Sequence, residues 1–458
     1  MEHIFRAYDI RGIWNRDLDP SVCLNIGLGL GSFLTKDLGF TKVSVGYDVR
    51  RTSEAFHGAL VSGLLSTGME VLSLGRCGFG VALFGGMKEN AEASLYITAS
   101  HLEPEWNGLK MYFGDGVGFP EEHIISVRDR VVKKEYSNVE WDDMGSYREM
   151  DYLPYYVDFW SSRYSPFIKG KGMKMAVDCG GGAMCLSAVR VLEAAGSSVV
   201  PINSEVDPHF SQRPSEPKPK NLGKLRDAVL DGGLSFGVAF DGDGDRAVVV
   251  DDTGRFLSTD RLGIIIAKDL LGEEGGGLIL ANVESSMAVE DVLEPLGAVV
   301  KRIKVGHTYL TLEARENGAL FGVERSGHLI VPKQVLFDDA IVAPLEILKI
   351  LSRTGYRLSE IADGVPEYPS DSSAFDCPDN TKFGVVEELR TDLTASFGKV
   401  NTMDGVRVDT EEGWVLIRCS NTSPVIRMTV EGRSQASLEA LKVEFGKILK
   451  EAIDRIEG

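Results

Sequence analysis

Short apolar runs alternate with longer amphipathic stretches along most of the chain. Runs of strand length lie at residues 43–46, 70–74, 94–98, 173–178 and 236–240, and helical periodicity fills residues 53–66 and about 183–195. Strands that alternate with helices are typical of α/β domains, in which helices cover the faces of a sheet. A similar order returns between residues 254 and 367. The pattern therefore predicts three α/β units in tandem.

The pattern changes after residues 363–369, a stretch with Gly and Pro that is typical of a linker. Strand candidates then lie between two helical stretches, at 405–408, 414–419 and 425–431 between about 383–395 and 438–456. Strands that are grouped in this way favour a small α+β domain. We therefore expect four domains, at residues 1–151, 152–253, 254–367 and 368–458, with Thr259 as the N-cap of the first helix in the third.

The most acidic motif, Asp241-Gly242-Asp243-Gly244-Asp245-Arg246, directly follows the apolar run 236–240. Three carboxylates at alternate positions repel one another unless a cation lies among them, and the two glycines let the chain bend tightly around an ion. We interpret the motif as a Mg²⁺ loop that is exposed in a cleft, with Asp241, Asp243 and Asp245 as ligands.

Two other interpretations of this motif remain. A Ca²⁺-binding EF-hand has the same initial spacing, but it requires Gly at the sixth position and Glu at the twelfth, where this chain has Arg246 and Asp252. An EF-hand loop also joins two helices, whereas both flanks here resemble strands. An acidic surface turn is the simpler alternative, because turns favour Asp and Gly without any metal.

The apolar run 94–98 leads directly into Ser100 and His101, and Lys110 follows after a loop that contains Pro104 and Gly108. A hydroxyl, an imidazole and an ammonium group could converge there on one phosphate. No GxSxG elbow surrounds the serine, which argues against ester or peptide hydrolysis. A serine that only caps a helix is the simpler alternative.

Two later stretches place polar side chains in loops after apolar strands. They are residues 306–309, with His307, and residues 322–328, with Glu324, Ser326 and His328. Carboxylate, hydroxyl and imidazole groups suit sugar hydroxyls, which both donate and accept hydrogen bonds. A helix-cap pair would explain the glutamate and the serine equally well.

Two further loops carry positive charge. Residues 418–424 combine Arg418 with an amide and several hydroxyl groups, which is typical of an anion-binding loop because phosphate needs many converging donors. A plain polar hairpin would not explain the positive charge in an acidic chain. Residues 47–51 follow a strand candidate, where they form either a ligand-binding loop or a solvated charge cluster.

Composition limits the classes of partner. The 458 residues carry a formal net charge of −19, which would repel nucleic acid and anionic lipid, so an anionic substrate would need a local basic cleft. No run approaches the roughly 18 apolar residues of a membrane span. The first residues lack the regions of a signal peptide, so we expect a cytoplasmic protein. The six cysteines lack CxxC spacing, which predicts buried thiols rather than zinc ligands or disulfides.

In combination, four of these loops resemble the α-D-phosphohexomutases, and within that family the phosphomannomutase/phosphoglucomutase group. The family's phosphoserine loop TASHNPxxYNGxK is similar to residues 98–110, its metal loop DGDGDR to 241–246, its sugar loop GEMSGH to 323–328 and its phosphate loop RxSNTTP to 418–424. The family's FRAYDIRG stands unchanged at residues 5–12. The resemblance covers the whole chain, and it implies four domains around a central cleft, of which the first three have mixed sheets with helices on both faces.

The chain departs from the family pattern at a few positions. Leu102 and Glu103 replace Asn-Pro, and Trp106 replaces Tyr, none of which carries the transferred group in the family. Val323 and Arg325 replace Gly and Met nearer the sugar. Residues 282–286 contain no match to a lysine that dual-specificity members carry in the third domain.

The resemblance implies an isomerase that interconverts mannose or glucose 1-phosphate and 6-phosphate through a phosphoserine and a hexose 1,6-bisphosphate. Mg²⁺ would be held by the three aspartates and by phosphorylated Ser100. The implied catalytic residues are Ser100, His101, Lys110, Arg246, Arg11 and His307. The implied substrate-binding residues are Tyr8, Glu324, Ser326, His328, Arg418, Ser420, Asn421, Thr422 and Arg427. A phosphoglucosamine mutase and a non-catalytic sugar-phosphate sensor are the alternatives, and the expected partner is a phosphosugar bound to a monomer or a dimer.

Overall fold

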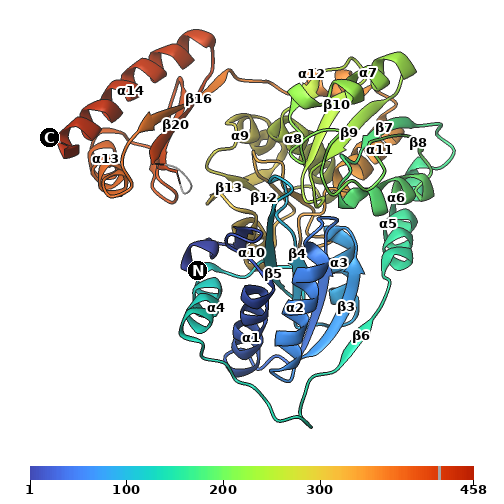
Figure 1. The fold of residues 1–458 in the computed structure, drawn as a ribbon. Helices are drawn as coiled ribbons and strands as arrows, with labels where there is room; N and C mark the ends of the chain where they lie inside the picture. Colours follow the sequence, from blue (N-terminus) through green and yellow to red (C-terminus); the bar gives the residue numbers. More distant parts are fainter. Residues whose placement is uncertain (421–423, 458) are drawn as a thin grey trace.

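The computed structural model describes residues 1–420 and 424–457. Each of four consecutive segments builds its own sheet, as the colour sequence in Figure 1 shows. Among the described residues, no helix has the length and apolar character needed to cross a bilayer. All six cysteines are free, and four of them are buried, which agrees with the expectation of buried thiols.

The first segment forms a six-stranded mixed sheet in the order β1-β5-β4-β2-β3-β6. Its strands are β1 (Asp9–Ile13), β2 (Lys42–Tyr47), β3 (Glu70–Arg76), β4 (Ala93–Ile97), β5 (Trp106–Phe113) and β6 (Tyr147–Glu149). Strands β4, β2, β3 and β6 run parallel, whereas β5 is antiparallel to both of its neighbours. The helices are α1 (Pro20–Lys36), α2 (Ser53–Leu65), α3 (Phe79–Lys88) and α4 (Glu121–Lys133).

The second segment forms a five-stranded sheet in the order β11-β10-β9-β7-β8. Its strands are β7 (Lys174–Asp178), β8 (Ser198–Ile202), β9 (Phe236–Phe240), β10 (Ala247–Asp251) and β11 (Phe256–Leu257), and its helices are α5 (Leu153–Ile168), α6 (Ala188–Ala194) and α7 (Gly223–Gly232). The expectation of a single helix at 183–195 is wrong, because a separate 3-10 turn at Ala183–Leu186 precedes α6.

The third segment forms a four-stranded sheet in the order β13-β12-β14-β15. Its strands are β12 (Gly277–Asn282), β13 (Ala298–Ile303), β14 (Phe321–Val323) and β15 (Leu329–Ile330), and its helices are α8 (Thr259–Glu274), α9 (Ala288–Leu293), α10 (His307–Asn317), α11 (Val342–Thr354) and α12 (Leu358–Asp363). The N-cap of α8 is Ser258, whose side chain accepts a hydrogen bond from the Arg261 N–H, and not Thr259.

The last segment forms a five-stranded antiparallel sheet in the order β16-β20-β19-β18-β17. Its strands are β16 (Ser370–Asp376), β17 (Val400–Asn401), β18 (Val406–Thr410), β19 (Gly413–Cys419) and β20 (Val425–Gly432), and its helices are α13 (Lys382–Ser396) and α14 (Gln435–Glu457). The predicted fold class of three α/β domains and one α+β domain is confirmed.

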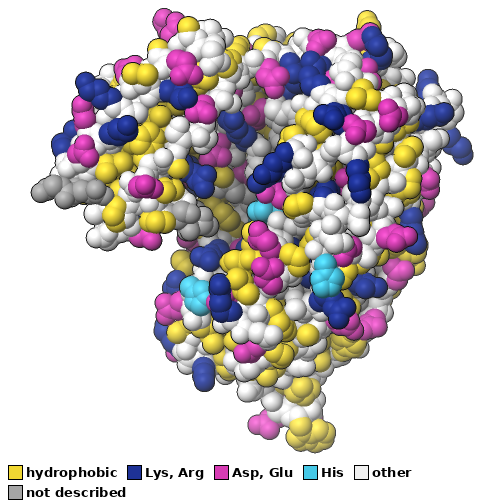
Figure 2. Space-filling model, turned by 45° about the horizontal axis from the view of Figure 1, so that its top comes forward, with side chains coloured by type: hydrophobic (Ala, Val, Ile, Leu, Met, Phe, Trp, Pro, Cys, Tyr) yellow, Lys and Arg dark blue, Asp and Glu magenta, His cyan; other side chains and the backbone are white. Residues whose placement is uncertain are grey.

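The fourth domain stands apart in Figure 1 and contacts the loops of the third. Trp414 packs against Val283 and Met287 in a small apolar cluster of its own. The Arg407 guanidinium donates to the Val283 and Ser285 carbonyls, at 2.7 and 3.2 Å. This contact leaves a cavity of about 560 Å³ that all four segments line. Figure 2 shows Lys and Arg side chains around the hollow between the fourth domain and the rest of the chain.

Candidate active site

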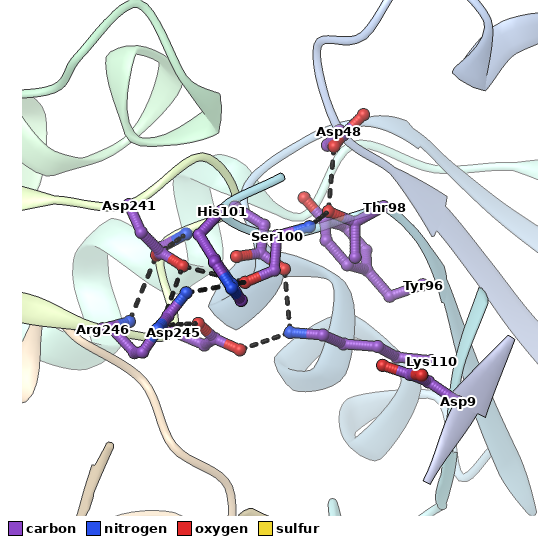
Figure 3. A network of polar contacts seen from close by, with 12 residues as sticks. Asp9, Asp48, Tyr96, Thr98, Ser100, His101, Lys110, Asp241, Asp245 and Arg246 are labelled. Carbon is purple, nitrogen blue, oxygen red and sulfur yellow. Dashed lines mark hydrogen bonds and ion pairs between the residues drawn. The ribbon is translucent and has the colours of Figure 1, made fainter. Parts of the chain in front are cut away.

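Ser100 lies at the floor of this cavity, on the turn that follows β4. Its backbone has a left-handed φ of +51°, which is uncommon for a residue other than glycine. Its Oγ donates to Asp241 Oδ2 at 3.0 Å and accepts from Arg246 Nη2 at 3.3 Å (Figure 3). His101 Nδ1 lies 3.3 Å from the same oxygen. The serine caps no helix, because β5 is the next element after this turn.

The buried ion pair of Asp48 and Arg50 holds the Ser100 turn through hydrogen bonds. Arg50 donates to the Ser100 carbonyl at 2.9 Å and to Asp48 Oδ2 at 3.1 Å, and Asp48 also accepts from the Thr98 hydroxyl. Asp48 and Arg50 are 0% and 3% exposed, so these two members of the 47–51 cluster are not solvated. They hold the loop that carries the hydroxyl in place.

The three aspartates of the acidic motif lie in the loop between β9 and β10, with ligand atoms within 4.8 Å of one another. The expectation that this loop is exposed is wrong, because none of the three is more than 1% exposed. Gly242 brings the loop so close to the first domain that a Cβ there would lie 2.4 Å from the Ser100 carbonyl oxygen. Burial and the neighbouring carboxylates raise the pKa of Asp241 well above its ordinary value.

The charge of the acidic loop is only partly compensated by the chain. Lys110 donates to Asp243 Oδ2 at 2.9 Å and to Asp245 Oδ2, and these carboxylates raise its pKa. Arg246 Nε lies 3.2 Å from Asp241 Oδ2. The second oxygen, Oδ1, of both Asp243 and Asp245 is buried and has no hydrogen-bond partner among the described residues. Unpaired carboxylate oxygens beside a hydroxyl fit a hard divalent cation such as Mg²⁺.

Three histidines border the cavity, and the pKa values of two of them lie well below that of a free imidazole. Burial and cationic neighbours lower the pKa of His101 to about 2. Burial also lowers the pKa of His307 to about 4, and its Nε2 is buried without a hydrogen-bond partner among the described residues. His328 stacks on His307 with ring centroids 5.5 Å apart, and its Nδ1 lies 2.5 Å from Asp338 Oδ2.

Asp338 is a residue of this site that the sequence did not single out. It is fully buried, and its Oδ2 lies 2.5 Å from His328 Nδ1, so it orients the His328 ring, while His307 Nδ1 lies 4.0 Å from the same oxygen. A signal was present, since Asp338 directly follows the apolar run 335–337, as Asp241 follows 236–240.

The sugar-loop residues lie in the turn between β14 and β15, which are antiparallel. The helix-cap alternative for Glu324 and Ser326 is therefore wrong. Glu324 is 1% exposed, and its carboxylate accepts from the Gly306 N–H, from Asn282 Nδ2 and from the Ser326 hydroxyl. Burial raises the pKa of this carboxyl group.

Residues from the N-terminal segment complete this wall. The Tyr8 hydroxyl donates to the Val305 carbonyl at 2.9 Å, and Arg11 Nε donates to Asp9 Oδ2 at 2.7 Å. Both side chains line the cavity.

The fourth domain contributes two arginines, Arg418 and Arg427, that face each other on β19 and β20. Like charges directly opposite on neighbouring strands are destabilising unless an anion lies between them. Both side chains line the cavity together with Ser420. Arg418 has no hydrogen-bond partner for Nε or Nη1 among the described residues, although Glu284 and Asp404 lie 3.2 and 3.5 Å from Nη1.

The structure brings most of the sequence-predicted site residues to one cavity. Those that line it are Tyr8, Arg11, Ser100, His101, Lys110, Asp245, Arg246, His307, Glu324, Ser326, His328, Arg418, Ser420 and Arg427. Asp241 and Asp243 lie beneath its floor, and Asn421 and Thr422 lie outside the described residues. Tertiary packing thus brings the Ser100 loop, the Glu324 loop and the two arginines of the fourth domain to one cavity.

Four family models match the chain in succession. They are the α/β/α domains I, II and III of phosphoglucomutase/phosphomannomutase at residues 2–138, 154–254 and 258–368, and the C-terminal domain of the same family at 375–448. Together they account for most of the chain.

Whole-chain relatives agree with these models. The chain is 32% identical to a "Probable phosphoglucosamine mutase" of Methanopyrus kandleri, with 100% of both chains covered. It is also 32% identical to a "Phosphoglucomutase/phosphomannomutase" of Thermococcus kodakarensis, with 99% of this chain and 100% of the relative covered. A phosphoglucomutase/phosphomannomutase family protein of Burkholderia thailandensis has a similar structure, with a TM-score of 0.90, 29% identity and 99% and 98% coverage. The chain therefore belongs to the phosphoglucomutase/phosphomannomutase family of the α-D-phosphohexomutase superfamily.

Proposed function

We propose that the protein interconverts hexose 1-phosphates and hexose 6-phosphates of glucose and mannose through a phosphoserine at Ser100 and a hexose 1,6-bisphosphate. The observation that carries the proposal is the position of the Ser100 hydroxyl between Asp241 and Arg246, at the floor of a cavity that Arg418 and Arg427 also line. One phosphate can react at the serine while the arginines hold the other.

Asp241, Asp243, Asp245 and the Ser100 phosphate would hold the Mg²⁺ ion, which when bound neutralises charge on the transferring phosphoryl group. The chain's own cations act on the same charge. Arg246 lies within hydrogen-bond distance of Ser100 Oγ, and Lys110 is held beside it by two aspartates. Phosphoryl transfer depends mainly on such positioning and charge stabilisation.

In each half-reaction the P–O bond to the donor oxygen breaks as the bond to the acceptor oxygen forms. The attacking hydroxyl loses a proton, and the leaving oxygen takes one up. Lys110 is protonated because its pKa is raised, so it acts as a donor and stabiliser rather than as a base. His307 is neutral at pH 7 and carries an unpaired Nε2 at the cavity, so it is the acceptor that we propose.

The product requires a turn of the bisphosphate between the two half-reactions. Arg418, Ser420 and Arg427 would hold the non-reacting phosphate in both orientations, and Glu324 and Ser326 would hold hydroxyls from the middle of the ring. The donors and acceptors at the sugar loop support this division.

A 2-amino sugar phosphate is the second candidate substrate. It is favoured by the name of one whole-chain relative, a "Probable phosphoglucosamine mutase", at the same 32% identity as the relative named for glucose and mannose. A coupled assay on mannose, glucose and glucosamine 1-phosphates would distinguish them, and turnover of the amino sugar alone would exclude the first choice.

Intact mass measurement tests the reaction class. We expect one added phosphate that maps to Ser100, lost in Ser100→Ala, together with mutase activity when Mg²⁺ and a hexose 1,6-bisphosphate are supplied. A matched Ser137→Ala variant, outside the cavity, should keep both. An unphosphorylated serine that the bisphosphate cannot phosphorylate, with no turnover of any hexose phosphate, would instead indicate a sugar-phosphate sensor.

A further inference from the structure

A second cavity, of about 570 Å³, lies between the first and second domains. Among the described residues, it shares no lining side chain with the cavity at Ser100. It opens at the carboxyl ends of the parallel strands β2, β3 and β6, which end at Tyr47, Arg76 and Glu149. Its volume lies in the range of cavities that hold small molecules. The proposed reaction gives none of its lining residues a role.

The helices that follow β2 and β3 lie on opposite faces of the first sheet. Phe56 of α2 belongs to the core cluster that includes α1, whereas Phe84 of α3 belongs to the cluster that includes α5. Val71 and Leu72, which are neighbours on β3, belong to these two clusters respectively. The chain therefore diverges between the ends of β2 and β3. In open α/β sheets such a divergence forms the crevice in which ligands, nucleotides among them, bind.

The inner wall of this second cavity combines aromatic, polar and apolar groups. His57 is 9% exposed, and its Nε2 lies 3.1 Å from the Ser73 hydroxyl. The Tyr47 ring lies beside the His57 ring, with centroids 5.0 Å apart. Apolar side chains complete the wall, namely Leu74, Val81, Leu153 and Leu186. An aromatic ring within such a wall suits a flat ring that carries polar atoms, such as a nucleobase.

Two arginines from different domains line the cavity. Arg76 ends β3 in the first domain, and Arg190 lies on α6 in the second. Both are exposed, and neither makes a hydrogen bond or an ion pair with another described residue. Guanidinium groups without such partners at the edge of a cavity suit a phosphate group.

Three carboxylates line the same cavity, so an anion without other groups would be repelled as well as attracted. Glu149 accepts from the Tyr147 hydroxyl, and Asp151 accepts from the Leu153 N–H at 2.9 Å. Glu54 makes no hydrogen bond or ion pair with another described residue. A carboxylate can accept hydrogen bonds from hydroxyls, as an acidic residue does from ribose in dinucleotide-binding folds. The lining therefore fits a molecule that carries a phosphate, hydroxyls and a flat ring.

We propose that this cavity binds a nucleoside monophosphate. The phosphate binds Arg76 and Arg190. The ribose hydroxyls donate to Glu54, and the base stacks on Tyr47. Because the two arginines belong to different domains, the bound nucleotide links the first domain to the second. The inference goes beyond the proposed mutase function and holds or fails independently of it.

Isothermal titration of the wild-type protein with AMP, GMP, CMP and UMP tests this proposal, since these probes differ only in the base. We expect at least one of them to bind at one molecule per chain with a Kd of about 1 mM or lower. Saturating glucose 1-phosphate should leave this Kd unchanged, because the two cavities are separate. Inorganic phosphate and the matching nucleoside should each bind at least about tenfold more weakly, because each lacks part of the contacts.

Two variants assign the binding to this cavity. Arg190→Ala should raise the Kd at least about tenfold through loss of a charge-assisted contact, and Tyr47→Leu should do so through loss of stacking. Arg226→Ala, on the exposed surface of α7, is the matched control and should keep the wild-type Kd.

Four results would overturn the proposal. They are no saturable binding of any of the four nucleotides by about 1 mM, displacement by glucose 1-phosphate, unchanged binding in both cavity variants, and inorganic phosphate that binds as tightly as the nucleotide. Displacement would place the nucleotide in the cavity at Ser100, and the last result would indicate a site for a simple anion only. Turnover of hexose phosphates is measured separately, so none of these results bears on the proposed function.

Discussion

The acidic loop at Asp241 and the phosphate loop at Arg418 border the same cavity but are built in different ways. The acidic loop is buried, and its backbone bonds to three domains through Phe79 N–H, Ala183 N–H and Ala340 N–H. The Arg418 side chain is 18% exposed, belongs to a domain whose strands β18 and β19 contact loops of the third domain, and has donors without a hydrogen-bond partner among the described residues. The proposed function accounts for this difference, because a reacting centre needs fixed charges, whereas a group that holds the other phosphate must release it when the ligand turns.

Substitution within the acidic loop should have the largest effect. Asp243→Asn removes one of three carboxylates, so we expect kcat to fall by about a thousandfold or more at saturating Mg²⁺, as loss of metal-assisted charge stabilisation implies. Folding should survive, because a neutral amide relieves repulsion among buried anions. Activity assays and thermal unfolding of the same preparations would measure both.

Asp231→Asn is the control for this change, since Asp231 is an exposed acid on α7. It should keep wild-type kcat. Near-normal turnover by Asp243→Asn would contradict the proposal that the acidic loop takes part in the reaction while the loop at Arg418 only binds phosphate.

The sugar loop lies between the two regions, and we expect it to discriminate strongly at C4. A turn that exchanges C1 with C6 also roughly exchanges O3 with O4, so Glu324 and Ser326 can bind those hydroxyls in both orientations. Galactose 1-phosphate, the C4 epimer, would leave the buried Glu324 carboxylate without this partner, and its kcat/KM should lie at least about a hundredfold below that of glucose 1-phosphate.

The same turn moves O2 to another part of the cavity, where it has no fixed partner. Glucose and mannose 1-phosphates should therefore differ by less than about a hundredfold in kcat/KM, or under about 3 kcal/mol of transition-state energy. All three sugars would be compared with one phosphorylated preparation. A galactose value equal to that of glucose would show that Glu324 and Ser326 do not bind O3 and O4.

Loss of the arginine in the phosphate loop should act on binding rather than on the chemical step. In Arg418→Ala we expect KM to rise by about 10- to 100-fold for both the 1-phosphate and the 6-phosphate, in line with the loss of a charge-assisted contact. Phosphorylation of Ser100 should persist because the two residues lie in different domains.

Arg455→Ala, on the exposed surface of α14 in the same domain, should leave KM unchanged. An effect of Arg418→Ala on only one of the two substrates would contradict a shared phosphate site.

A buried carboxyl group outside the cavity, Asp339, should affect stability rather than activity, and it accepts from the Tyr156 hydroxyl at 2.6 Å. Burial raises its pKa to about 7. The folded state then binds a proton that the unfolded state releases above about pH 4, so the stabilisation from this group is complete at low pH and is lost as pH rises to 7.

Relative to Asp339→Asn, the wild type should therefore lose up to about 4 kcal/mol between pH 4 and 7 and nothing further above it. Denaturant unfolding of both proteins across this range would measure the difference. A difference that does not vary with pH would show that burial alone does not keep this carboxyl group protonated.

Much of the site could be predicted because its polar and charged residues lie in short sequence motifs. Ser100, the three aspartates and Arg418 stand out from residue type and spacing alone. Asp338 did not, because its role depends on two rings that reach it from α10 and from the turn before β15. The burial of the acidic loop was also missed, since a motif does not show what packs over it.

The sequence by itself determined the alternation of strands and helices, the change to an α+β domain near residue 368 and the chemistry that each loop can offer. These follow from local periodicity and from the side chains themselves. Only the tertiary structure decided which loops meet. Ser100 bonds to Asp241 and Lys110 to Asp243 across 141 and 133 residues, and Glu284 reaches Arg418 from another domain. Contacts so distant along the chain arise from the packing of whole domains, which no local pattern specifies.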